Sequence, residues 1–153
     1  MTPTCDNKSV GIILKNSNGE YLILLRKSNP KVYAFLASHV DVHGGSVETA
    51  KEEVQKEAGA SGVMLKLLLN KDYPNPCSRG GTHHLWNVFE GIYNGPTSDS
   101  DAGSVFWKTS DEIKKLIERT KSYNRGKIFQ EDWERNPGLE DVWINILEDA
   151  RIL

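Results

Sequence analysis

The order of the predicted elements indicates an α+β domain, an α/β/α sandwich with a mixed β-sheet between helices. Two observations support this prediction. Short β-rich apolar runs recur from Val10 to Lys108, and amphipathic helical patterns both interrupt these runs and close the chain. The 153 residues contain no linker-like tract, internal repeat or low-complexity segment, so we expect one domain over residues 1–153.

The predicted strands are segments rich in apolar, β-branched or aromatic residues. They cover residues 10–14, 21–25, 33–36, 39–43, 63–69, 82–93 and 105–108. The turn Asn16–Gly19 between the first two is typical of a β-hairpin. A loop is predicted over residues 73–81, where Pro and Gly gather.

The first predicted helix, Val47–Ala58, is the centre of the candidate site. Ser46 is predicted as its N-cap and Gly59 as the left-handed residue that ends it. Four small or apolar residues recur at helical spacing and predict a buried stripe: Val47, Ala50, Val54 and Ala58.

Two further helices follow. Thr109–Glu112 resembles a capping box, which opens a helix through about Arg119. Residues 139–153 form a closing amphipathic helix whose start is marked by Pro137 and Gly138, with a helical turn or two before it around residues 129–134. Val142, Ile146 and Leu147 are predicted on its inner side.

Composition excludes several classes of protein. The chain is 38% hydrophobic and 26% charged, as globular proteins are. A net charge of −2 without a basic run argues against general nucleic-acid or membrane-surface binding, and no apolar run approaches a membrane span. We therefore expect a cytoplasmic protein.

Cys5 and Cys77 form no paired motif, so two reduced thiols are expected.

The carboxylates of the first helix carry the predicted chemistry. Glu53 and Glu57 lie one turn apart on a flank of the buried stripe, so both can point at one divalent cation. The spacing of the histidines does not favour a zinc site. Adjacent strand residues such as His83 and His84 point to opposite faces, and His39 and His43 have no matching Cys spacing.

The stretch 38–60 resembles a degenerate Nudix box, the signature of the Nudix hydrolase family. The family's first glycine falls on Ser38, its first glutamate on Gly44 and its arginine on Glu52. The positions that agree are Glu53, Val54, Glu57, Gly59 and Ala60, whereas Lys56 stands where the first of the paired glutamates belongs. The resemblance continues through Trp107–Ile113 and Asn136–Glu140, so a Nudix-type mixed sheet is expected.

The resemblance implies hydrolysis of a nucleoside diphosphate-linked substrate, a small nucleotide-like molecule, with Mg²⁺ or Mn²⁺. Glu53 and Glu57 would be the metal ligands and catalytic residues. Glu52 and Lys56 exchange the family's charges across one helical turn, and we interpret them as a solvated i, i+4 pair.

Further site residues are predicted around this helix. Asp101, or the nearby Asp99, is the candidate base, with a solvated acidic loop as the alternative. Four side chains are candidate substrate contacts: Arg26, Tyr73, Arg79 and Trp86. Trp86 fits the core equally well. Two functions stay open, a metal-dependent pyrophosphohydrolase and an inactive Nudix-fold protein that binds a nucleotide or a protein.

Overall fold

The computed structural model describes residues 4–40 and 45–153, and its strands form one mixed sheet. The strands are β1 (Lys8–Lys15), β2 (Tyr21–Arg26), β3 (Tyr33–Ala34), β4 (Leu36–His39), β5 (Lys66–Tyr73), β6 (His84–Ile92) and β7 (Gly103–Lys108). The helices are α1 (Ser46–Ala58), α2 (Ser110–Asn124), α3 (Gln130–Arg135) and α4 (Asp141–Asp149).

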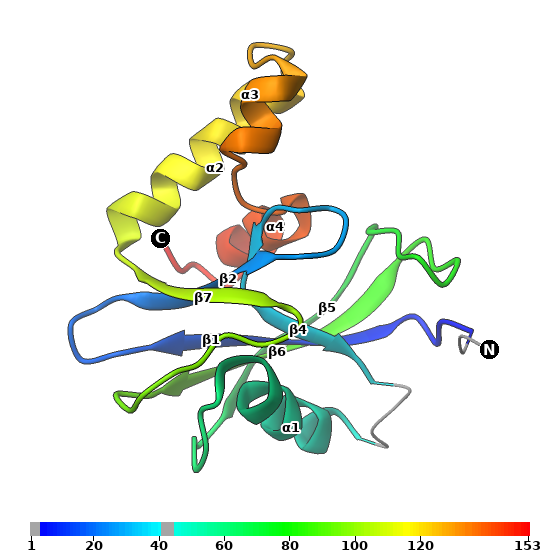
Figure 1. Cartoon of the computed structure of the whole chain (residues 1–153). Helices are drawn as coiled ribbons and strands as arrows, with labels where there is room; N and C mark the ends of the chain where they lie inside the picture. Colours follow the sequence, from blue (N-terminus) through cyan, green and yellow to red (C-terminus); the bar gives the residue numbers. More distant parts are fainter. Residues whose placement is uncertain (1–3, 41–44) are drawn as a thin grey trace.

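Strand β1 lies at the centre of the sheet. It runs parallel to β6 along its whole length and pairs antiparallel with β4 and with the end of β2. The outer strands are β5 beside β6, and β3 and β7 beside β2. Helix α1 covers one face and α4 the other, while α2 and α3 project from the side of α4 (Figure 1). This arrangement confirms the predicted α/β/α sandwich with a mixed sheet.

Each face of the sheet has its own apolar core. On the α4 side Trp143 is fully buried and packs against Phe35 and Trp86, with ring centroids 4.9 Å and 5.5 Å apart. On the α1 side Ala50, Val54 and Ala58 pack over the sheet. Burial of both faces explains why β1 is apolar almost throughout instead of alternating.

The strand predictions hold with shifted ends. The main shift is in the segment predicted at 63–69, where the observed strand is Lys66–Tyr73. This strand pairs with β6 from Lys66 opposite Glu90 to Tyr73 opposite His84, and this pairing sets its ends. The brief strand predicted at 39–43 is confirmed only at His39, the last residue of β4. Residues 41–44 lie outside the described part of the chain, so His43 and Gly44 do too.

The helix predictions need four corrections. Helix α2 continues to Asn124, beyond the end predicted at about Arg119. Ser46 is not the N-cap of α1: Gly45 is, and Ser46 is the first helical residue, whose hydroxyl accepts from Asn87. Val47 is 44% exposed, so only the rest of the predicted stripe is buried. The closing helix is Asp141–Asp149, shorter than predicted. The left-handed Gly59 and the capping box from Thr109 to Glu112 are confirmed.

Candidate functional site

Helix α1 places both predicted carboxylates inside the protein. Glu53 is 3% exposed and Glu57 is 8% exposed, and both lie on the face of α1 that packs against β1 and β4. The stripe of small residues brings this face close to the sheet, and the spacing of one turn puts the two carboxylates side by side. They therefore lie within the buried face of α1, whereas helical spacing alone predicts them on a flank of the buried stripe.

The two carboxylates share a hydrogen bond, which fixes their protonation. Burial, followed by the hydrogen bond and the charge of Glu53, raises the pKa of Glu57 to about 9, against an ordinary value of 4.5. A backbone hydrogen bond from Ala37 of β4 and the charge of Lys56 oppose this rise. Glu57 thus holds a proton at neutral pH in the metal-free protein.

One oxygen of this pair has no partner among the described residues. Glu57 Oε2 is buried and accepts no hydrogen bond there. An unsatisfied buried carboxylate oxygen is unfavourable unless a cation or a donor completes it. Two carboxylates are also what Mg²⁺ takes from a protein when phosphate oxygens and water supply the other ligands. The donor set therefore fits Mg²⁺ or Mn²⁺.

The exchanged charges of the box lie outside this pair. Glu52 and Lys56 are both exposed, on the side of α1 away from the sheet. Lys56 still acts on the site through its charge, since it lowers the pKa of Glu57 against the larger effect of burial. The helix thus supplies two buried carboxylates and one nearby cation in place of a third carboxylate.

The candidate base lies in the loop that contacts the end of α1. Ser98 N–H donates to Ala58 O at 2.9 Å, which holds this loop against the helix. Asp101 is exposed in the turn before β7, whereas Asp99 accepts from the backbone of Val105 at 3.0 Å. Both side chains are exposed, and they differ in that Asp99 is engaged by the backbone of Val105.

The two predicted arginines lie in different surroundings. Arg26 ends β2 and pairs with Glu140 at 2.8 Å, linking the sheet to the start of α4. Arg79 is half-buried in the loop between β5 and β6, where its charge acts on Cys77. The structure therefore does not bring them together at a common phosphate position.

The two predicted aromatic contacts belong to the core. Tyr73 is 4% exposed, and its hydroxyl donates to Asp149 at 2.5 Å. Trp86 is 3% exposed and donates its indole N–H to Asn75 Oδ1 at 3.0 Å. For Trp86 the core interpretation is the one observed.

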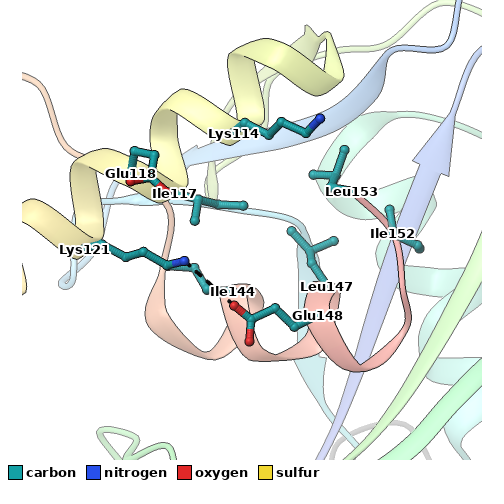
Figure 2. Close-up of a pocket in the computed structure, with 9 residues that line it drawn as sticks. All are labelled: Lys114, Ile117, Glu118, Lys121, Ile144, Leu147, Glu148, Ile152 and Leu153. Carbon is teal, nitrogen blue, oxygen red and sulfur yellow. Dashed lines mark ion pairs between the residues drawn. The ribbon is translucent and has the colours of Figure 1, made fainter.

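Two hollows on the surface of the described residues have linings that do not include the carboxylates. One of about 180 Å³ lies between α2 and α4, with an apolar floor that includes Ile117, Ile144 and Leu147 and the ion pair of Lys121 with Glu148 at its rim (Figure 2). A second, of about 530 Å³, lies beside α1 and the segment 60–65. Neither is lined by Glu53 or Glu57, so the chemistry of the side chains, and not hollow shape, defines the site.

Comparison with solved structures identifies the fold. The chain is similar to the E. coli dihydroneopterin triphosphate pyrophosphohydrolase, with a TM-score of 0.64 and 14% identity over 82% of this chain and 94% of that one. It is also similar to a NUDIX family hydrolase from Clostridium perfringens, with a TM-score of 0.64 and 13% identity over 94% and 95% of the two chains.

A third solved structure shows the same likeness with a ligand bound. The NUDIX domain of Shewanella oneidensis NrtR, complexed with ADP ribose, matches with a TM-score of 0.61 and 10% identity over 75% of this chain and 79% of that one. No protein-family model matches the sequence, and the comparison with curated proteins gives no match. The chain has the Nudix fold, which confirms the predicted resemblance at the level of the fold.

One group of neighbouring side chains is not predicted by the sequence. Cys5, His39, Cys77 and His84 come from four separate segments and meet at one end of the sheet. As predicted, His83 and His84 do not share a site, since His83 points outward to Asp72 at 3.2 Å. No short sequence motif contains Cys5, His39, Cys77 and His84, because the hydrogen-bonded Cys5 and His84 are 79 residues apart.

Proposed function

We propose that this protein is a Nudix-type pyrophosphohydrolase that cleaves a nucleoside diphosphate-linked substrate with Mg²⁺ or Mn²⁺. The observation that carries the proposal is the buried pair Glu53 and Glu57. Burying two carboxyl groups side by side is unfavourable for stability, so the pair is better explained by a ligand than by folding. The same positions are the ones that match the Nudix box.

The roles of the residues follow from their placement. Glu53 and Glu57 would hold the metal ion, and Glu57 must release its proton to do so. When bound, the ion would neutralise pyrophosphate charge and lower the pKa of a water molecule, which would make hydroxide available as the nucleophile. Asp101, exposed in the loop held against α1, is the proposed base, and the N–H of Ala37 orients Glu57 from β4.

A small nucleotide-like molecule is the proposed substrate. Two structurally similar proteins are described as a pyrophosphohydrolase of dihydroneopterin triphosphate and as a domain complexed with ADP ribose. Arg26 and Arg79 remain separate candidate phosphate contacts, and the buried Tyr73 and Trp86 are not retained as substrate contacts. Among the described residues no helix is long and apolar enough to cross a membrane. We propose the cytoplasm as the place of action.

Hydrolysis by a matched pair of variants tests this proposal. Nucleotide sugars, dinucleotides, ADP-ribose and nucleoside triphosphates are incubated with Mg²⁺ or Mn²⁺ and the wild-type protein, Glu57→Gln or Glu52→Gln. Glu52 is the matched control because it is an exposed carboxylate on the same helix. We expect Glu57→Gln alone to lose turnover. Turnover that is absent with every substrate, or equal in all three proteins, rejects the proposal.

A second function is favoured by the charge of Lys56. A cation that acts on Glu57 reduces the negative charge available to a metal, which is consistent with a Nudix-fold protein that binds a nucleotide or a protein without cleaving it. Calorimetric titration with ADP-ribose, with and without Mn²⁺, distinguishes this case. Binding without turnover supports the binding function, and turnover excludes it.

A further inference from the structure

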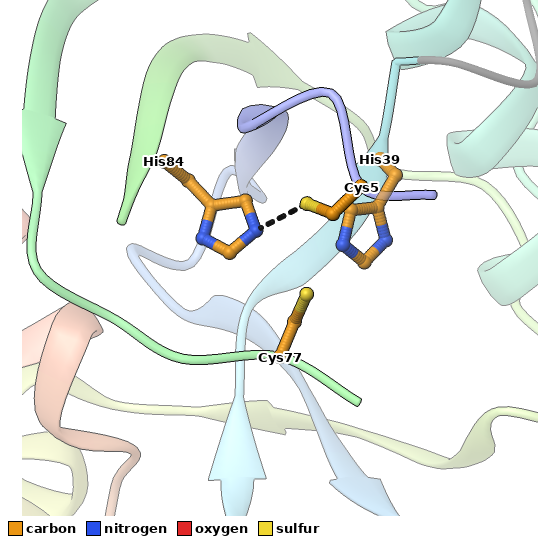
Figure 3. A group of neighbouring side chains, drawn as sticks. All are labelled: Cys5, His39, Cys77 and His84. Carbon is orange, nitrogen blue, oxygen red and sulfur yellow. Dashed lines mark hydrogen bonds between the residues drawn. The ribbon is translucent and has the colours of Figure 1, made fainter. Parts of the chain in front are cut away.

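Four side chains that bind soft metals converge at the end of the sheet where the chain begins. Their ligand atoms, the sulfurs of Cys5 and Cys77 and one ring nitrogen each of His39 and His84, all lie within 4.8 Å of one another. Figure 3 shows the two rings and the two sulfurs facing a common point. Cys5 Sγ is 3.2 Å from His84 Nε2, and the two imidazole centroids are 5.4 Å apart.

These separations match those of a tetrahedral metal site. With metal–sulfur bonds near 2.3 Å and metal–nitrogen bonds of about 2.0–2.1 Å, neighbouring ligand atoms in a tetrahedron are about 3.3–3.8 Å apart. The observed distance of 3.2 Å and the upper limit of 4.8 Å bracket this range. Only small side-chain movements would therefore be needed to close four ligands around an ion.

The surroundings of His84 leave the required nitrogen free of a proton. His84 Nδ1 lies 2.8 Å from the carbonyl oxygen of Asn75. Because a carbonyl only accepts, Nδ1 must carry the hydrogen, and in the neutral ring the lone pair is then on Nε2, which faces Cys5. A backbone carbonyl on the second ring nitrogen is a common feature of metal-binding histidines. The side chain of Asn75 is itself fixed by Trp86 at 3.0 Å.

Backbone N–H groups point at both sulfurs. Asn7 N–H donates to Cys5 Sγ at 3.3 Å, and Arg79 and Gly81 supply the same kind of hydrogen bond to Cys77. Such bonds stabilise negative charge on sulfur, the form that binds a metal. The loop is shaped for this arrangement, since Cys77 N–H also donates to Gly81 O at 2.9 Å.

Gly81 shows how closely the sulfurs approach the chain. A Cβ atom at this position would lie 2.8 Å from Cys5 Sγ and 3.0 Å from Cys77 Sγ, which is closer than side chains tolerate. Gly81 is buried beside the cluster. The backbone therefore closes one side of the group and leaves no room for a side chain there.

We propose that Cys5, His39, Cys77 and His84 bind one Zn²⁺ ion in a structural site. Two thiolates and two neutral imidazoles balance the charge of Zn²⁺, so the half-buried centre would be neutral. Two sulfur and two nitrogen ligands in a tetrahedron favour zinc over the hard ions that Glu53 and Glu57 would take. Four protein ligands leave no position for a substrate, which is typical of structural zinc.

Zinc binding releases two protons and requires no oxidant. The proton between Cys5 Sγ and His84 Nε2 and the thiol proton of Cys77 leave as Zn²⁺ enters, with no change in oxidation state. A disulfide between Cys5 and Cys77 would instead require an oxidant and would leave both imidazoles unused.

The site would join the N-terminal segment, β4, the β5–β6 loop and β6. It would hold β4 two residues from Ala37, which contacts Glu57.

Metal analysis of the full chain tests the proposal. We expect one Zn²⁺ per chain in protein purified without chelator. After removal of zinc under reducing conditions, one equivalent of Co²⁺ should give the intense visible d–d bands of tetrahedral cobalt with sulfur-to-cobalt charge transfer, and Zn²⁺ should displace it. Because this measurement uses the wild-type protein, it does not depend on the folding of any variant.

Variants locate the ion. Cys77→Ser should bind Zn²⁺ at least about 100-fold more weakly and lose charge-transfer intensity. His83→Ala should bind Zn²⁺ normally, because His83 precedes His84 in sequence but points outward to Asp72. Glu57→Gln should also bind normally, which separates this site from the carboxylate pair. Absence of zinc and of cobalt bands, a Cys5–Cys77 disulfide in the purified protein, or equal binding by Cys77→Ser would overturn the proposal.

Discussion

The two candidate metal sites of this protein bury ionisable side chains in opposite ways. Glu53 and Glu57 come from consecutive turns of one helix and are joined by a hydrogen bond that keeps a proton on Glu57. Cys5, His39, Cys77 and His84 come from four segments. Backbone N–H groups at Cys5 and Cys77 and a backbone carbonyl at His84 favour free electron pairs on the two sulfurs and on His84 Nε2. Burial of the carboxyl pair destabilises the native state when no cation is bound. The cysteine and histidine group would stabilise the native state when a metal is bound.

This difference separates function from stability. A site with two ligands leaves positions on a metal for phosphate and water, so it suits chemistry. A site with four ligands leaves none, so its metal acts as a cross-link between distant segments. Substitutions in the two sites should therefore change different properties, and the predictions below test that division from the largest expected effect to the smallest.

The largest effect is expected from loss of zinc. With free Zn²⁺ at about 1,000 times its dissociation constant, binding stabilises the native state by about 4 kcal/mol. Cys77→Ser or chelation should lower the free energy of unfolding by about that amount, measured by urea denaturation with and without added Zn²⁺. His83→Ala is the control and should keep the zinc response. A Cys77→Ser protein as stable as the wild type contradicts the assignment.

The next effect concerns turnover. Glu57→Gln should lower the rate of pyrophosphate hydrolysis at least about 100-fold, because an amide cannot supply the anionic oxygen that a hard cation needs. Its zinc content should be that of the wild type. If Glu57→Gln loses zinc as well, the two sites are not independent.

The close approach at Gly81 gives a third test. Gly81→Ala adds a methyl group within 3.0 Å of both sulfurs, so it should force them apart and cost about 2 kcal/mol in the zinc-loaded protein. The matched control is Gly80→Ala, whose added Cβ meets no atom within 4 Å but whose positive φ of 85° carries its own strain. Zinc affinity should fall in the first variant and stay unchanged in the second.

The protonation of Glu57 predicts a dependence of stability on pH. Its pKa in the native state, about 9, lies above the ordinary value of 4.5, so the native state binds a proton that the unfolded chain releases between these values. The stability contribution is complete below pH 4.5 and is lost as pH rises toward 9. Without divalent metal, Glu57→Gln should gain about 1 kcal/mol relative to wild type from pH 6 to pH 7, measured by urea denaturation. An unchanged difference argues against the shared proton.

The smallest effect is expected on the exposed side of α1. Exchanging the charges by Glu52→Arg with Lys56→Glu should raise Mn²⁺ affinity about threefold to tenfold, since an anion replaces a cation near Glu57 but solvent screens both. Glu52→Arg alone is the control and should change little. A double variant that binds Mn²⁺ no better than the wild type shows that Lys56 does not limit the carboxylate site.

The sequence by itself determined the elements whose signals are local. Helical periodicity placed Glu53 and Glu57 on adjacent turns, the capping box located the start of α2, and the apolar runs gave the strands of an α/β/α sandwich. Local patterns could not place Ser46 and Gly45 correctly, because the hydroxyl of Ser46 is used by Asn87 from a distant strand.

Tertiary structure decided which side chains share an environment. Whether Trp86 faces core or substrate, and how deeply the carboxylates are buried, depends on the packing of α1 and α4 on opposite faces of the sheet. The cysteine and histidine cluster depends on it entirely: the parallel pairing of β1 with β6 and the antiparallel pairing with β4 bring the segments that carry its members to one end of the sheet. Periodicity describes neighbours along one element, whereas contacts between elements are fixed only when the strands pair.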